Sequence, residues 1–173
     1  QAMCNAAVLL GELGSEPAHV TKIKTYLTDR AYRPAVYGAV ERHLAGIPRV
    51  GTGLVVNGLA LPEMDVELDI DAVIPADPNR PHERLRPFST GDWFGQPFDW
   101  HGCMVVKTDD EIFLRGQTGS RLDGSGMAGA GYTPADAAAQ ADLAMTNART
   151  LLEEAGSGLD DVCKMRVYIR DRA

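Results

Sequence analysis

The sequence predicts a protein of the α+β class, and three patterns support this prediction. The first is an internal repeat in which a helical pattern is followed by a strand pattern. The second is a set of segments whose apolar and polar residues alternate, as side chains do along a half-buried strand. The third is a β-hairpin pattern in the second half of the chain. The 173 residues are 45% hydrophobic and 24% charged, which suffices for a full hydrophobic core.

The repeat joins the two ends of the chain. Residues 2–31 match residues 144–173 without a gap, so that Ala31 corresponds to Ala173, 142 positions later. Identical pairs include Asn5/Asn147, Leu9/Leu151, Leu10/Leu152, Glu12/Glu154, Gly14/Gly156, Lys22/Lys164, Tyr26/Tyr168 and Asp29/Asp171. Ungapped identity of this extent indicates two copies of one unit.

Each copy is expected to form a helix followed by a strand. In the second copy Thr133 is a typical N-cap, Pro134 suits the first helical position, and Asp136 suits the first turn. Gly156 is a plausible helix stop, and residues 162–169 alternate as a strand does. In the strand of the first copy, Ile23 and Leu27 lie opposite Lys22, Lys24 and Tyr26.

Between the copies the sequence predicts a helix from Pro34, strands near 52–59 and 64–74, and a hairpin over 101–119. Residues 75–99 contain five prolines and are interpreted as a linker without secondary structure. A stretch of this kind is typical of a boundary between domains.

We therefore expect residues 1–75 to be the C-terminal part of a first unit, 76–97 a linker, and 98–173 the N-terminal part of a second unit. On this interpretation the chain begins and ends at nearly equivalent points of two tandem domains.

Charge and composition exclude several classes of partner. A net charge of −7 and a pI near 5.0 disfavour nucleic acid. No apolar run is long enough for a membrane span, and no signal peptide precedes the first helix. The three separated cysteines suit reduced thiols in the cytoplasm.

The histidines show no metal-ligand spacing. The segment Gly124–Gly129 fits the pattern G-x-G-x-x-G, but it does not open a helix as a dinucleotide site requires. We expect neither metal nor cofactor.

The sequence resembles the Rid (YjgF-type) reactive-intermediate deaminase family, as a tandem member. The resemblance is carried by FLRGQTG (113–119), by the helix-to-strand segments 147–171 and 9–30, and by the strand pair 51–75. It implies a chorismate-mutase-like α+β fold with mixed sheets packed against helices, and self-association as a trimer or pseudo-hexamer. It also implies hydrolysis of small enamine or imine acids to a keto acid and ammonia.

Such a reaction needs a cation for the substrate carboxylate, and the resemblance suggests two arginines. The family carries its arginine at the start of a strand; anchored on Thr52, that position is Val50, and Arg49 is one residue early. A slip of one residue sends a side chain to the opposite face of a sheet, and Arg49 would then be a solvated charge. A one-residue deletion in the preceding loop would instead return Arg49 to the position of the family's arginine. Arg115, just before Gly116, is the alternative cation.

The remaining candidates are an acid and several substrate-binding groups. Asp69 aligns with the acid that holds the hydrolytic water in the family, although it also fits the polar face of an amphipathic strand. Gly116 and Gln117 match the Gly-Gln that binds the ligand through backbone amides. His101 matches a ligand-side position, and Trp100 stands near where the family carries a tyrosine. Two functions stay open: a deaminase, or a non-catalytic binding or interaction module on the same fold.

Overall fold

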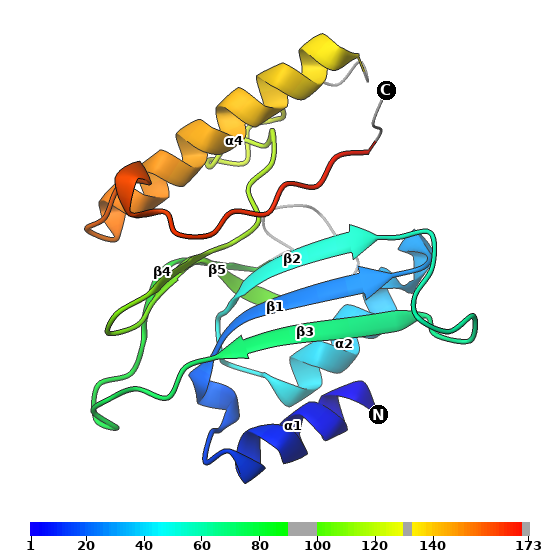
Figure 1. The fold of residues 1–173 in the computed structure, drawn as a ribbon, viewed down its shortest axis with the longest axis vertical. Coiled ribbons are helices and arrows are strands. Elements are labelled where there is room, and N and C mark those ends of the chain that lie inside the picture. Colours follow the sequence, from blue (N-terminus) through cyan, green and yellow to red (C-terminus); the bar gives the residue numbers. More distant parts are fainter. Residues whose placement is uncertain (90–99, 130–132, 171–173) are drawn as a thin grey trace.

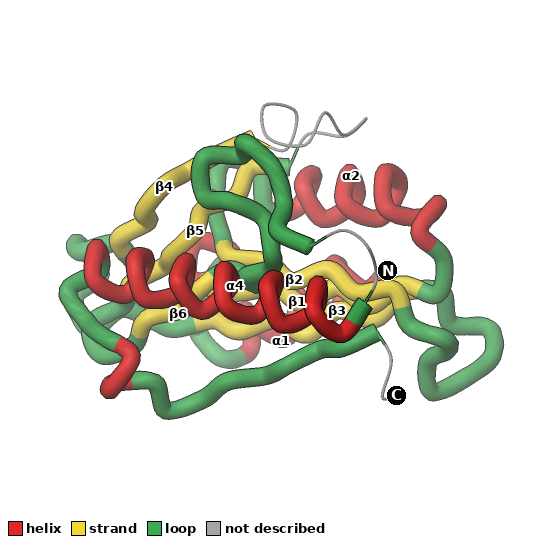
Figure 2. The backbone as a smooth tube through the Cα atoms, turned by 90° about the horizontal axis from the view of Figure 1, so that it is seen from above, coloured by secondary structure: helices red, strands yellow, loops and turns green. Residues whose placement is uncertain are grey.

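The chain forms two three-stranded sheets with helices on both sides, which confirms the α+β class (Figures 1 and 2). The structure is a computed structural model and describes residues 1–89, 100–129 and 133–170. Helices α1 and α2 lie on one side of the first sheet, and α4 lies on the other. The elements are α1 (Ala2–Glu12), β1 (Val20–Leu27), α2 (Arg33–His43), β2 (Val50–Val55), β3 (Val66–Ala72), β4 (Glu83–Ser89), β5 (His101–Lys107), β6 (Ile112–Leu114) and α4 (Pro134–Glu154).

The first sheet has the order β2-β1-β3, with β1 parallel to β2 and antiparallel to β3. Because residues paired across strands share a face, the register assigns every side chain to one of two faces. Lys24 pairs with both Thr52 and Asp69, whereas Ile23 pairs with Gly51 and Ile70. We call the first set the polar face and the second, which α1 and α2 cover, the helix face. The polar face carries Lys22, Lys24, Tyr26, Val50, Thr52, Leu54, Glu67, Asp69 and Asp71.

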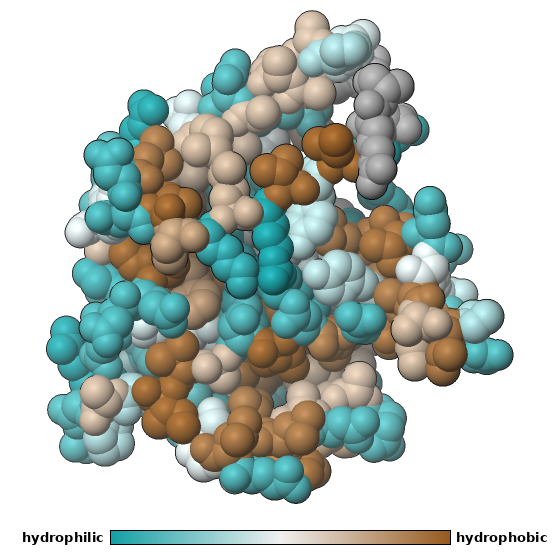
Figure 3. All heavy atoms as spheres, viewed as in Figure 1, coloured by the Kyte–Doolittle hydropathy of each residue, from teal (hydrophilic) through white to brown (hydrophobic). Residues whose placement is uncertain are grey.

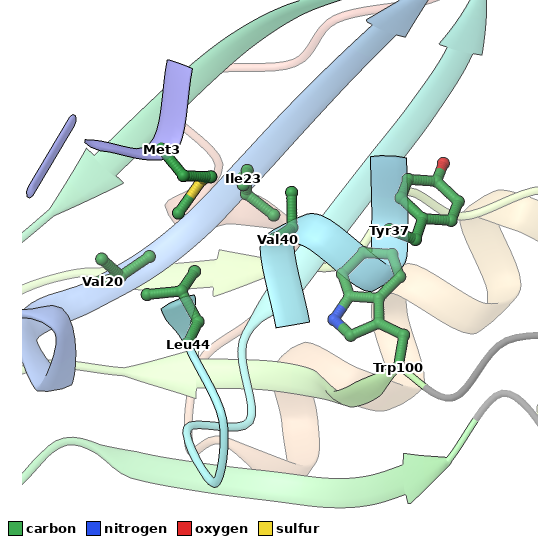
Figure 4. Packing of buried hydrophobic residues seen from close by; sticks show 7 residues of the cluster. All are labelled: Met3, Val20, Ile23, Tyr37, Val40, Leu44 and Trp100. Carbon is green, nitrogen blue, oxygen red and sulfur yellow. The ribbon is translucent and has the colours of Figure 1, made fainter. Parts of the chain in front are cut away.

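The main hydrophobic core lies on the helix face (Figure 4). Its buried members come from α1, β1, α2 and the segment before β5. They are Met3, Val20, Ile23, Tyr37, Val40, Leu44 and Trp100. Each large apolar side chain that is fully buried stabilises the fold by roughly 1.5–3 kcal/mol relative to exposure. This core therefore holds α2, and with it the loop that leads into β2, against the first sheet.

The second sheet, β4-β5-β6, is antiparallel and joins the first sheet through β2. The amide of Cys103 donates to the carbonyl of Arg49 over 3.1 Å, and that of Gly116 donates to Gly51 over 3.2 Å. The predicted hairpin is confirmed as β5 and β6. A strand from the first half of the chain thus lies beside a hairpin from the second half.

The helix of each repeat forms as predicted, but its surroundings differ. Both helices end before a glycine of positive φ, 69° at Gly14 and 80° at Gly156, and a short 3₁₀ turn follows each. The Thr133 hydroxyl accepts from the amide of Asp136, which confirms the predicted cap. Leu151 of α4 is buried against the hairpin sheet, whereas its counterpart Leu9 is 59% exposed. Figure 3 shows hydrophobic residues at the surface along the lower edge of the molecule.

The strand predicted over 162–169 is not formed. These residues are exposed and have no ladder, although their counterparts form the central strand β1. A strand needs hydrogen-bonded neighbours: β1 has β2 and β3, whereas residues 162–169 pair with no strand among the described residues. The segment instead runs past the polar face. The Arg166 guanidinium lies 3.7 Å from the Asp69 carboxylate, and Tyr168 shares a hydrogen bond with Tyr26.

The proline-rich stretch also differs from the prediction, because β4 forms within it and pairs with β5. Pro87 is accommodated because β4 is an edge strand, where one face of the backbone needs no ladder partner. Residues 90–97 of the expected linker lie outside the described residues, and the division into two units stays a prediction. Within the described ranges, no helix combines the length and apolarity that crossing a bilayer requires.

Candidate functional site

The predicted site residues are divided between the two faces of the sheet. Asp69 lies on the polar face, because it pairs with Lys24, which also pairs with Thr52. Arg49 precedes Thr52 by three positions, so alternation places it on the opposite face. Its contact with Glu41 of α2 agrees with that placement. Arg49 and Asp69 therefore do not line one cleft.

Arg49 is a buried ion-pair residue. Its side chain is 1% exposed, and its Nη2 lies 2.8 Å from Oε2 of Glu41. Its Nη1 donates to the carbonyls of Ile47 (3.0 Å) and Leu44 (3.3 Å) at the end of α2. Burial lowers the pKa of the guanidinium, and the hydrogen bond that Arg49 donates to Glu41 opposes that shift. The alternative of a solvated charge is therefore wrong, whereas the placement of Arg49 in a substrate pocket stays a prediction.

Trp100 and His101 gather at the same ion pair. The Trp100 ring lies 5.4 Å from the Arg49 guanidinium, within cation–π distance. Nδ1 of His101 lies 2.9 Å from Oε1 of Glu41. Three predicted residues are thus brought together, but around a structural carboxylate on the helix face. Sequence reasoning missed Glu41, since one acid in a polar helix carries no signal of a buried partner 8 residues later.

Arg115 groups with aromatic side chains rather than with Asp69. Its guanidinium lies 5.2 Å from the centre of the Phe88 ring. Burial lowers the pKa of Arg115, and the nearby Tyr37 of α2 opposes the shift. The side-chain amide of Gln117 donates to the carbonyl of Arg115 over 3.0 Å. The predicted alternative cation therefore lies towards α2, as Arg49 does.

The polar face combines cations and acids around Asp69. Nζ of Lys24 forms an ion pair with Asp69 and lies 4.0 Å from Asp71. The Lys24 side chain is 8% exposed, whereas that of Asp69 is 41% exposed, so the carboxylate stays open to solvent while the ammonium is covered. Because the Arg166 guanidinium also lies 3.7 Å from this carboxylate, Asp69 contacts two positive charges, those of Lys24 and Arg166. A carboxylate in a defined orientation can position water for attack.

The hairpin end approaches this face through Gly116. A side chain there would place its Cβ 2.8 Å from Oγ1 of Thr52, so only glycine allows this approach. The amide of Gly116, which the resemblance assigns to the substrate, donates to Gly51 in the ladder between the sheets. Gly116 therefore lies at the hairpin end beside the polar face, as expected, but its amide is already used in the hydrogen bond to Gly51.

Lys22 is a cation of this face that sequence reasoning did not single out. It pairs with Val50, the position that corresponds to the family's arginine, and its Nζ donates to the carbonyl of Leu114 over 3.1 Å. Burial lowers the pKa of Lys22, although the carboxylate of Asp71 opposes the shift. Alternation showed that Lys22 and Lys24 share a face, but only the register shows which residues they meet.

A cavity of about 360 Å³ lies away from both groups, between β4, the loop after β6, and α4. It is lined by Arg86, Arg121, Leu122, Asp123, Leu143 and Asn147. Arg86 is paired with Glu154 through contacts of 2.8 and 2.5 Å, so its charge is already matched. In the described part of the chain, no three His, Cys, Asp or Glu side chains are grouped so as to hold a metal ion.

Parts of the chain match known proteins. Residues 103–173 match the family model described as Endoribonuclease L-PSP. Solved structures with similarity include a YjgF/YER057c/UK114-family protein from Mycobacterium tuberculosis (26% identity, TM-score 0.41) and a YjgF-family protein from Neisseria meningitidis (30% identity, TM-score 0.39). The alignments cover 42% and 41% of this chain. They span 62% and 60% of those proteins, less than two thirds of either. No curated protein matches the chain.

The fold and the polar face define an α+β protein with a mixed first sheet and a hairpin-bearing second sheet. The match over residues 103–173 agrees with the family resemblance of the sequence. The tandem arrangement stays a prediction.

Proposed function

We propose that the chain belongs to a hydrolase that deaminates a small enamine or imine acid to a keto acid and ammonia. The observation that carries this proposal is the accessible Asp69 carboxylate, oriented by Lys24 on a face that also carries Lys22 and ends at Gly116. These groups supply an acid–base residue and cations for an anionic substrate.

In this proposal Asp69 orients water against the C=N carbon of the substrate. As the water oxygen bonds to carbon, the π electrons move to nitrogen and Asp69 takes the water proton. Asp69 then returns the proton to the substrate nitrogen, the C–N bond breaks, and ammonia leaves as the carbonyl forms. Arg166 attracts the substrate carboxylate to this face. Neither metal nor cofactor takes part in the proposed steps.

The competing function is a non-catalytic ligand-binding or interaction module. It is favoured by the internal ion pairs of Asp69 and by the use of the Gly116 amide in the sheet. A ribonuclease, as the family description suggests, is disfavoured by the net charge of −7.

We also propose that the protein is cytoplasmic and self-associates as a trimer or pseudo-hexamer. Light scattering after size-exclusion chromatography tests the number of subunits.

Ammonia release from 2-iminopropanoate, formed in situ by an amino-acid oxidase, tests the deaminase. We expect acceleration over buffer, and a loss of about 100-fold or more in kcat/KM for Asp69→Asn. Glu67→Gln, on the same strand and face but exposed, is the matched control and should stay within about twofold. No acceleration by the folded protein would favour the binding module, whereas full activity of Asp69→Asn would overturn the role proposed for Asp69.

Arg49 and Arg115 stay candidates for gripping the carboxylate, and the same assay separates them. Arg115→Ala should raise KM if its guanidinium binds substrate. Arg49→Met in combination with Glu41→Leu removes the buried pair without leaving one charge behind. If that double variant keeps its activity, Arg49 is structural, as its burial indicates.

A further inference from the structure

We propose that Lys22 is a nucleophile, whose amine forms a covalent imine with the 2-imino acid substrate or its 2-oxo acid product. This inference rests on the proposed function and changes one step of it, because the water oriented by Asp69 adds to an imine held on Lys22 instead of to the free substrate. It starts from a difference between the two lysines of the polar face. Lys24 is covered and bound to carboxylates, whereas Lys22 is partly exposed and donates to a backbone carbonyl.

The partners of the two amines determine which of them can react. Nζ of Lys24 is held in an ion pair by Asp69, and Asp71 lies 4.0 Å away. Among residues 1–89, 100–129 and 133–170, no carboxylate lies within 4.0 Å of Nζ of Lys22. Its acceptor is the carbonyl of Leu114, two residues before Gly116. An ammonium group without a carboxylate partner gives up its proton more readily.

The electrostatic surroundings of Lys22 act in the same direction. Desolvation lowers its pKa most; Lys24 and Arg166 lower it further, while Asp71 and Asp69 oppose them. Only the neutral amine attacks carbon, so a lowered pKa increases the reactive fraction at neutral pH. The same face holds Asp69 for proton transfer and Arg166 for the substrate carboxylate.

The reaction balances without an oxidant or reductant. The neutral Nζ attacks C2 of the protonated imino acid, and the C=N π electrons move to the substrate nitrogen. After a proton passes from Nζ to that nitrogen, its bond to C2 breaks and ammonia leaves, while Nζ forms the imine. Water, deprotonated by Asp69, then adds to C2. Collapse of the adduct expels the Lys22 amine and yields the 2-oxo acid, so the sum is imino acid plus water to oxo acid plus ammonia.

The repeat provides a matched control within the chain. Lys164 is the counterpart of Lys22 at the same offset of 142 residues, and each lysine follows a valine by two positions. Lys164 is exposed on the segment that forms no strand. The two lysines thus share their local sequence and differ in burial, neighbours and hydrogen bonding. A reactivity that depended on local sequence alone would be equal at both.

The experiment incubates the folded chain with pyruvate and sodium cyanoborohydride, then maps reduced adducts by peptide mass spectrometry. We expect modification at Lys22 at least about tenfold above Lys164. Lys22→Arg, which keeps the charge, should abolish that adduct and lower ammonia release, whereas Lys164→Arg should change neither. Circular dichroism confirms that each variant is folded.

The outcomes separate this inference from the proposed function. Equal labelling of the two lysines, or unchanged ammonia release by Lys22→Arg, would overturn the nucleophile and leave the deaminase intact. An adduct at Lys22 without ammonia release would keep the reactive amine and overturn the deaminase. Neither adduct nor ammonia release would overturn both.

Discussion

The buried pair of Arg49 and Glu41 predicts a large loss of stability when one partner is removed. Their side chains are 1% and 15% exposed, and the charged atoms are 2.8 Å apart. Removing one partner of such a pair typically costs about 3–5 kcal/mol, because the remaining charge stays desolvated without compensation. Glu41→Gln keeps an oxygen that can accept from Arg49, so we expect the lower value, about 3 kcal/mol. For a chain of this size, that lowers Tm by about 6–12 °C.

Urea unfolding followed by circular dichroism measures the loss, with Arg86→Gln as the control. The pair of Arg86 and Glu154 has comparable contacts, but its side chains are 40% and 36% exposed. Exposed pairs contribute about 0–1 kcal/mol. A loss below about 1 kcal/mol for Glu41→Gln, equal to that of the control, would refute the reasoning that burial makes this pair matter.

Three further predictions concern packing and ionisation. Gly51→Ala would place a Cβ 2.6 Å from Cζ2 of Trp100 and should lower the free energy of unfolding by about 1–3 kcal/mol; an unchanged urea midpoint would contradict this. Tyr26 shares a hydrogen bond with Tyr168, which is the largest of the effects that raise the pKa of Tyr26 to about 12, so Tyr168→Phe should lower that pKa in an ultraviolet titration; no change would place the 162–170 segment elsewhere. Burial raises the pKa of Cys103 to about 11, so at pH 8 a thiol reagent should modify it at least about 100-fold more slowly than the two exposed cysteines, and unfolding should remove the difference.

Local rules predicted the elements whose signals are local. The start of α4 followed from Thr133, Pro134 and Asp136, because a cap and its acceptor lie within one turn. The hairpin of β5 and β6 followed from two short apolar runs around the polar turn at Thr108-Asp109-Asp110. The division of β1 into an apolar and a polar face also followed, because alternation is a property of any strand.

Predictions failed where a strand depends on distant partners. Residues 162–169 carry the same pattern as β1, yet only β1 lies between two strands that can bond with it. Conversely, β4 forms in a proline-rich stretch because β5 offers it a ladder on one side. Strand formation is decided by pairing at long sequence separation, and a local pattern does not contain that information.

The sequence by itself determined the types of chemical group, their alternation along each strand, and the repeat. Tertiary structure alone decided which groups meet. The register of β1 with β3 brings Asp69 to Lys24, 45 positions away, and the packing of α2 on the helix face turns Arg49 to Glu41. The physical reason is that cross-strand register and helix packing minimise the free energy of the whole core. The partner of a side chain therefore depends on the whole fold, whereas the alternation of side chains between the two faces of a strand follows from the local sequence.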